Sequence, residues 1–203
     1  MKLLKKISMG FVALVTSASL ALSANISLLT GPQDSSQLIA TMNQVIQAIN
    51  AGVVGKLYAN GVTVGTGADT TEDTLYTYTL PANTLANTGD MLRIRCGTTS
   101  PATATNKTVK LYFGASSFST GAVAVNPGSF NTELIVIRTG AATQAVWGSG
   151  SGGDDGTQVV LLATYTAGTD DLTTALTIKC TGTNGTANAN DISGRFMSVE
   201  MIK

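Results

Sequence analysis

Hydrophobic and polar residues alternate along three short runs in the middle of the chain, between Leu75 and Phe113. Every second residue of each run is apolar: Tyr76, Tyr78 and Leu80; Leu92, Ile94 and Cys96; Val109, Leu111 and Phe113. Most positions between them hold threonine, arginine or lysine. A period of two with one apolar face is typical of a strand that buries one side. The pattern therefore predicts three strands of an antiparallel sheet.

The rest of the chain after residue 53 continues this pattern. Asn60-Gly61, between two short apolar runs, predicts a β-hairpin. Further candidate strands, separated by clusters of turn residues, lie at residues 122–126, 133–138, 144–147, 158–166, 175–180 and 195–202. Roughly eight to ten strands with no helix between them indicate a sandwich or a barrel. We predict an all-β fold, an antiparallel jelly-roll sandwich, for residues 53–203.

Residues 31–52 show the period of a helix instead. The opposite face of this segment carries no charge, and its apolar stripe has a 4-3-4 spacing: Leu38, Met42, Val45 and Ile49. An amphipathic helix of this kind can lie on its own β domain. The same spacing is that of the a and d positions of a coiled coil, so these four residues are also candidates for an oligomer interface.

The first 30 residues are predicted to form an apolar N-terminal arm. Within it, residues 1–24 resemble a secretory signal, because lysines precede an apolar stretch at residues 7–15 and small residues that could form a cleavage site follow. The apolar stretch is shorter than the ~20 residues of a membrane span. We expect the alternative, an arm that is retained from Met1 and buried against protein. Intact-mass measurement of the native protein tests this, because a chain that begins near Ala24 would show cleavage.

Composition narrows the class of protein. Hydrophobic residues make up 43% of the 203, which is enough for a core, but charged residues are only 12%, about half the usual ~25%. The solvent-facing surface must therefore consist mostly of threonine, serine, asparagine and glutamine, as is expected of an extracellular or particle-borne β protein. Lys plus Arg equals Asp plus Glu, at twelve each, so no basic surface for nucleic acid is expected.

The sequence offers little catalytic or metal-binding chemistry. It has no histidine, which is the commonest general base and metal ligand. It has no nucleophile elbow and no phosphate-binding loop, so we expect no enzyme, no cofactor and no metal site. The glycine-rich tract 148–156 is expected to be a flexible exposed loop, and Asp154 and Asp155 within it lack the spacing of a calcium loop. Trp147, beside the tract, could bind a sugar, but we expect it to pack in the core.

Cys96 and Cys180 end two similar strands and face inward by parity. As the third and eighth strands of a jelly roll, these two strands would be antiparallel neighbours in one sheet. Such neighbours lie end against start, which would separate the sulfurs by about five residues, or roughly 15 Å at ~3.3 Å per residue. A disulfide needs Cα atoms within ~7 Å. We therefore predict that both cysteines are reduced and not bonded to each other.

Three segments of the β region resemble a recurring pattern in structural proteins of tailed bacteriophages. They are TLPANTLANTGDMLRIRCGTTSPATATNKTVKLYFGAS, VIRTGAATQ and LTTALTIKCTGTNGTANANDISGRFMSVEMI, and the pattern covers roughly residues 73–202. Residues 28–50 also resemble the leading helix of such proteins, whereas the first 24 residues fall outside the pattern. The resemblance implies a jelly-roll module that serves as a capsid decoration or cement protein, a head fibre or a part of a tail fibre.

On this resemblance we expect a non-enzymatic bacteriophage virion structural protein, most specifically a capsid decoration or cement protein. The expected partners are further copies of itself, in a trimer, and the major capsid protein or other virion proteins, with no nucleic acid. Two alternatives stay open. One is a fibre-type module that binds a host surface glycan. The other is a secreted or cell-surface bacterial β protein that is adhesive or lectin-like.

Overall fold

The computed structural model describes residues 55–101, 103, 105–124, 127–154 and 157–202. These residues form an all-β fold without a helix. The strands are β1 (Gly55–Asn60), β2 (Val64–Gly65), β3 (Glu72–Leu80), β4 (Met91–Ser100), β5 (Asn106–Phe113), β6 (Ser116–Ser119), β7 (Val123–Ala124), β8 (Gly128–Gly140), β9 (Thr143–Asp154), β10 (Thr157–Gly168), β11 (Leu176–Asn184) and β12 (Ser193–Ile202). The all-β prediction is therefore confirmed. The predicted arm 1–30 and helix 31–52 lie outside the described residues.

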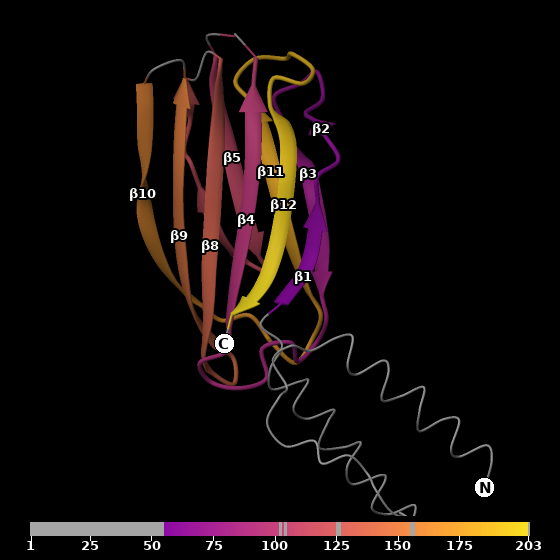
Figure 1. Ribbon diagram of the computed structural model, residues 1–203, viewed down its shortest axis with the longest axis vertical. Helices are drawn as coiled ribbons and strands as arrows, with labels where there is room; N and C mark the ends of the chain where they lie inside the picture. The colour runs from indigo at the N-terminus through magenta and orange to yellow at the C-terminus, as the bar shows by residue number, and fades with distance from the viewer. Residues whose placement is uncertain (1–54, 102, 104, 125–126, 155–156, 203) are drawn as a thin grey trace, which may run out of the picture. The chain divides into compact units, whose positions relative to one another are not determined.

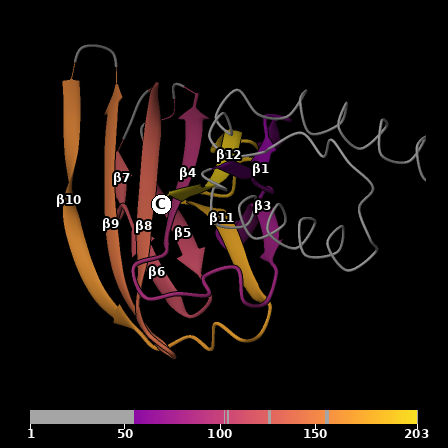
Figure 2. The ribbon, with the colours of Figure 1, turned by 60° about the horizontal axis from the view of Figure 1, so that its bottom comes forward.

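The strands form two antiparallel sheets that pack face to face as a sandwich (Figures 1 and 2). The larger sheet has the order β1-β12-β4-β8-β9-β10, with β2 also on β12, and the smaller has the order β3-β11-β5-β6, with β7 also on β5. Without the short β2 and β7 and the β9–β10 hairpin, eight strands remain. In chain order they are arranged 1-8-3-6 in the larger sheet and 2-7-4-5 in the smaller. This is the order of a jelly roll, here with a hairpin added at one edge of the larger sheet.

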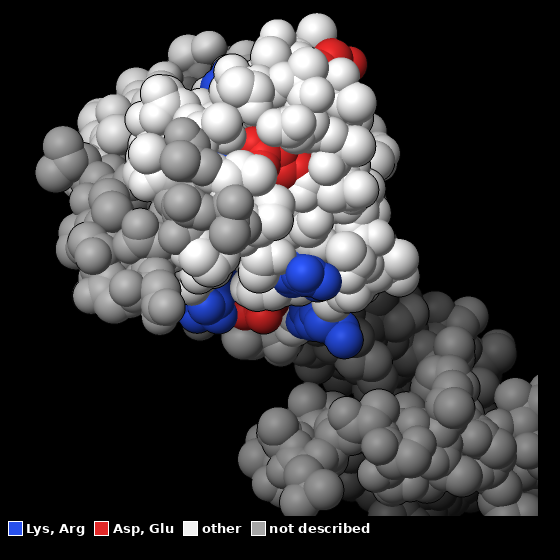
Figure 3. Space-filling view, turned by 90° about the horizontal axis from the view of Figure 1, so that it is seen from above, with Lys and Arg blue, Asp and Glu red and all other residues white. Residues whose placement is uncertain are grey.

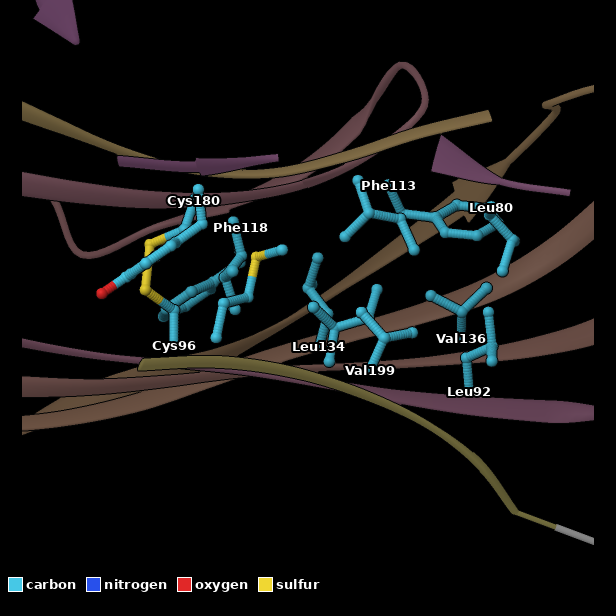
Figure 4. Close-up of a cluster of buried hydrophobic side chains, with 14 of the residues drawn as sticks. Leu80, Leu92, Cys96, Phe113, Phe118, Leu134, Val136, Cys180 and Val199 are labelled. Carbon is cyan, nitrogen blue, oxygen red and sulfur yellow. A yellow bond between two sulfur atoms is a disulfide. The ribbon is translucent and has the colours of Figure 1, made fainter. Parts of the chain in front are cut away.

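The core lies between the two sheets and follows the predicted alternation (Figure 4). Every second residue of β4 and β5 is fully buried: Leu92, Ile94, Cys96, Val109, Leu111 and Phe113. The strand β3 departs from strict alternation because it carries a β-bulge opposite the step from Cys180 to Thr181. The extra residue of the bulge, Leu75, is buried next to Tyr76, whereas a regular strand would point the two side chains to opposite faces.

The hairpin predicted at Asn60-Gly61 is not formed. The flanking strands β1 and β2 both pair antiparallel with β12, so they run in the same direction along one edge of the sheet. At the break between them, the Val62 N–H donates to Oδ1 of Asn60, and the Tyr76 hydroxyl donates to the carbonyl of Val62, both at 2.8 Å. The Asn-Gly signal is local, and pairing with β12 overrides it.

The glycine-rich tract is not the flexible loop that we predicted. Its residues 148–154 are the second half of β9, and they pair with β8 on one side and with β10 on the other. Its glycines make room for aromatic side chains of the core. A Cβ added to Gly148 would lie 2.5 Å from Cβ of Phe118, and one added to Gly152 would lie 2.9 Å from Cδ1 of Phe130. Close packing, rather than flexibility, requires these glycines.

Gly148→Ala is expected to destabilise the fold by about 1–3 kcal/mol. Phe118 is 2% exposed and its own Cβ blocks the new methyl group. Gly97→Ala is the matched control, because its new Cβ would meet the ring of Phe196, which is 37% exposed and can turn into solvent. Urea unfolding of both variants measures the difference, and equal losses of unfolding free energy would contradict the packing argument.

Cys96 and Cys180 form a disulfide bond, so the prediction of two reduced cysteines is wrong (Figure 4). Their Cα atoms are 6.4 Å apart. The strand count explains the difference, because β11, which carries Cys180, is the seventh strand of the jelly roll and β12 is the eighth. The third and seventh strands lie in opposite sheets. The two inward side chains therefore meet across the core, and the bond ties the two sheets together.

A buried ion pair joins the start of β5 to the loop before β12. The side chains of Lys107 and Asp191 are both 0% exposed, with 3.8 Å between Nζ and Oδ2. Lys107 Nζ donates to the carbonyl oxygens of Thr103 and Thr105 at 2.8 and 3.0 Å. The hydroxyls of the same two threonines donate to Asp191. Charge is thus placed inside the fold, while the surface seen at the end of the sandwich in Figure 3 is mostly uncharged.

Candidate functional site on the larger sheet

The outer face of the larger sheet carries an exposed aromatic pair. Trp147 of β9 and Tyr165 of β10 are direct cross-strand neighbours, and their ring centroids are 5.0 Å apart with an interplanar angle of 51°. Trp147 is 50% exposed and Tyr165 is 57% exposed, so the prediction that Trp147 packs in the core is wrong. Its neighbour Val146, at 2% exposure, fills the inward position instead.

The aromatic pair continues into a cross-strand row of outward side chains. Trp147 lies opposite Ile135 of β8, and Ile135 lies opposite Arg93 of β4. Beside this row, Oε2 of Glu133 lies 3.5 Å from Nε of Arg93 and 3.7 Å from Nε of Arg95. These three charged side chains are 30–42% exposed, so their ion pairs add little to stability. The face therefore offers apolar rings near hydrogen-bonding groups, which is a combination that a ligand could contact.

The outer face of the smaller sheet is polar instead. Glu72 accepts hydrogen bonds from Lys110 Nζ and from the Tyr112 hydroxyl, both at 2.7 Å, and Lys179 Nζ lies 4.4 Å from the centroid of the Tyr112 ring. Partial burial alone would raise the pKa of Glu72, but the hydrogen bonds from Lys110 and Tyr112 outweigh it and hold that pKa below its ordinary value. The hydrogen bond to Glu72 raises the pKa of Lys110. Burial, and then the same carboxylate, raise the pKa of Tyr112. The polar groups named here are thus hydrogen-bonded or packed against one another.

Two of the segments that resemble phage virion proteins are hydrogen-bonded to each other. Arg138, in the RTGAATQ segment, donates from its guanidinium to the carbonyl of Leu85, in the TLPANTL segment. The backbone adds two bonds, from Gly89 N–H to the Arg138 carbonyl at 2.8 Å and from Arg138 N–H to the Asp90 carbonyl at 2.9 Å. Leu85 is 1% exposed. These residues therefore fix the β3–β4 loop against the end of β8.

Two buried polar residues of the resembling segments, Gln144 and Asn184, have the same kind of role. Gln144 is 2% exposed and exchanges two hydrogen bonds with the backbone of Asp170, at 2.8 and 3.0 Å. Asn184, in the TGTNG segment, is also 2% exposed; it accepts from the Thr66 hydroxyl at 2.7 Å and donates to the Gly67 carbonyl at 2.9 Å. These two residues thus also hold strand–turn junctions of the jelly roll in place.

The residues predicted to form an oligomer interface lie outside the described part of the chain: Leu38, Met42, Val45 and Ile49. Asp155 of the glycine-rich tract also lies outside it. Within the described residues, no group of three or more His, Cys, Asp and Glu side chains could hold a metal ion. No helix in that part of the chain is long and apolar enough to cross a membrane.

The sequence analysis did not predict the aromatic pair, although the sequence indicates that one of its two members, Trp147, lies on the surface. Val146 and Trp147 are adjacent, so if the valine faces the core, the tryptophan must face solvent. The pairing with Tyr165 depends on the register of the β9–β10 hairpin. That register contains a bulge between Leu161 and Thr164, which no sequence pattern indicates.

Comparison with known proteins does not assign the chain to a family. No family model and no curated protein matches it. A chain in the structure of infectious bursal disease virus, Gx strain, is similar with a TM-score of 0.33 and 11% identity, over 71% of this chain and 32% of that one, so this chain spans about a third of its length. The CBM2 module of the evolved Dit of Lactobacillus casei BL23 phage J-1 is similar with a TM-score of 0.25 and 8% identity, over 61% of this chain and 67% of that one. Both solved structures are viral, and both TM-scores are too low to define a function.

Proposed function

We propose that this chain is a non-enzymatic structural protein of a bacteriophage virion, and specifically a capsid decoration or cement protein. One observation carries the proposal: the segments that resemble phage virion proteins supply the buried residues, Leu85, Gln144 and Asn184, that fix the turns of the jelly roll. A rigid β module of low charge would fill gaps between capsid subunits. Buried contact area, rather than a single site, would stabilise the particle. The partners are copies of this chain and the major capsid protein or another virion protein.

We also propose that the helix expected at residues 31–52 joins the copies into a trimer. Val45→Asp with Ile49→Asp places charge in the apolar stripe and should lower the mass of the assembly in sedimentation velocity, with the β circular dichroism unchanged. Gln44→Asp with Gln47→Asp is the matched control, because it adds the same charge to the polar face. If the Val45→Asp, Ile49→Asp variant stays oligomeric but loses β structure, the helix packs in the core of its own β domain and does not join the copies.

Immunogold labelling tests the virion assignment. Antibodies raised against the purified chain should label the heads of phage particles released by the culture that encodes it. Label on tail fibres alone would favour the fibre alternative. Antigen found only in the particle-free secreted fraction would overturn the virion proposal and favour the secreted β protein. The Cys96–Cys180 bond suits both locations, because virion surfaces and secreted proteins share an oxidising environment.

Glycan binding by a fibre-type module is a second candidate function, and the exposed pair Trp147 and Tyr165 favours it. Such rings combine a large apolar surface with a polar tip. Trp147 is the one tryptophan of the chain, so its fluorescence reports on this face directly. Chitohexaose and cellohexaose are suitable first probes. Either should shift the Trp147 emission of the native chain but not that of Tyr165→Ala, and an unchanged spectrum at millimolar sugar would count against this function for both glycans.

A further inference from the structure

Among the described strands, the sandwich has four sheet edges, and three of them are protected against pairing with another strand. The edge strand β1 has six residues and a bulge between Lys56 and Tyr58. The edge strand β3 carries Glu72 and Asp73 as well as a bulge. The third edge consists of β6 and β7, with four and two residues. Short length, charge and bulges are the means by which proteins block pairing at edge strands.

The fourth edge, β10, lacks most of this protection. It is twelve residues long, and within the described part of the chain it pairs only with β9. Its sequence, TQVVLLATYTAG, has no charged residue and no proline. One bulge interrupts its pairing with β9, and regular pairing resumes from Thr164 to Gly168. A long, uncharged edge strand presents a row of backbone groups to which a further strand can bind.

The second half of β10 also has side chains without cover from the smaller sheet. Every side chain from Ala163 to Ala167 is exposed, on both faces of the strand. Thr166 pairs with the buried Val146 and has the same inward parity, so a full sandwich would cover it. Figure 2 shows β10 beyond the outermost strands of the smaller sheet. This part of β10 therefore extends beyond the area of the larger sheet that the smaller sheet covers.

We propose that β10 pairs antiparallel with β10 of a second copy of this chain, so that the two larger sheets become one. An added strand can hydrogen-bond to the whole row of backbone groups along an exposed edge. Pairing of β10 with itself brings no like charges together, because the strand carries none. The other edges of the described domain are short, charged or bulged, so β10 of a second copy is the strand that this chain offers.

A contact between identical strands is isologous and joins two chains. It is separate from the helix contact of the proposed trimer. The smallest closed assembly that uses both contacts has six chains, and this is the assembly that we expect. The pairing itself does not depend on the proposed function, whereas the number six rests on it.

Sedimentation velocity of the full chain tests the pairing. Thr164→Lys and Thr166→Lys, made separately, bring like charges together in the paired strands and are expected to halve the mass of the assembly, from six chains to three. Thr177→Lys is the matched control, because Thr177 is an exposed threonine inside the smaller sheet, and it should leave the mass unchanged. All three threonines are exposed, so each variant should keep its β structure, which circular dichroism checks.

The outcomes separate the pairing from the proposed trimer. A native dimer that Thr166→Lys converts to monomers would support the pairing and overturn the trimer. A mass that neither lysine variant changes would overturn the pairing and leave the trimer standing. Hydrogen exchange gives a second measurement, because the amides of residues 163–167 that point away from β9 should exchange faster in the lysine variants. If the amides that point away from β9 stay protected in a monomer, another segment of the same chain covers β10, which also overturns the pairing.

Discussion

Lys107→Met is expected to lower the free energy of unfolding by about 3–5 kcal/mol. Methionine is close to lysine in length but carries no charge, so the variant leaves the Asp191 carboxylate buried without the ammonium group. The hydroxyls of Thr103 and Thr105 still donate to this carboxylate, but they cannot neutralise it. Both side chains of the pair are 0% exposed, so water cannot screen the remaining charge. Urea unfolding followed by circular dichroism measures the loss.

A double-mutant cycle isolates the interaction between the two charges. Asp191→Asn removes the carboxylate, and each single variant then leaves one buried charge. The double variant should therefore lose less stability than the sum of the single losses. Lys179→Met is the matched control, because Lys179 is partly exposed above the ring of Tyr112, and it should lose at most ~1 kcal/mol. Additive losses in the cycle would contradict the pairing of Lys107 with Asp191.

Alternation along the chain predicts most of the strands because each of them buries one face. The inward residues of β4 and β5 follow the pattern at every position from Leu92 to Cys96 and from Val109 to Phe113. Periodicity does not specify which strands are neighbours. The β9–β10 hairpin adds two strands outside the jelly-roll order. Cys180 can be assigned to the seventh of the eight strands only if these two added strands are left out of the count.

Other features depend on packing that is remote in sequence. The glycine at position 148 is typical of a flexible tract until Phe118, thirty positions earlier, is known to lie against it. Asn60-Gly61 predicts a hairpin until β12 is known to pair with both flanking strands. Lys107 and Asp191 fall beside turns, where charged residues are ordinarily solvated. The candidate site also depends on contacts that are remote in sequence. Alternation along β9 can place Trp147 on the surface, but only the register of the sheet brings Tyr165 beside it.

Removal of the Cys96–Cys180 disulfide is expected to lower the free energy of unfolding by about 4–5 kcal/mol. The bonded residues are 84 positions apart, and a cross-link that closes so long a loop strongly restricts the unfolded chain. In a domain of this size, each kcal/mol changes the thermal midpoint by about 2–4 °C. The midpoint of the reduced protein should therefore fall by roughly 8–20 °C. Differential scanning calorimetry with and without a reducing agent measures the shift.

Two further measurements separate the bond from the packing of its sulfur atoms. The reduced native chain keeps both sulfurs, whereas Cys96→Ala with Cys180→Ala removes them from positions that are 0% exposed. The double variant should therefore be less stable than the reduced native chain, because small cavities remain in the core. The unreduced native chain must also be two hydrogen atoms lighter than the reduced one. If reduction changes neither the mass nor the midpoint, the bond is absent from the native chain.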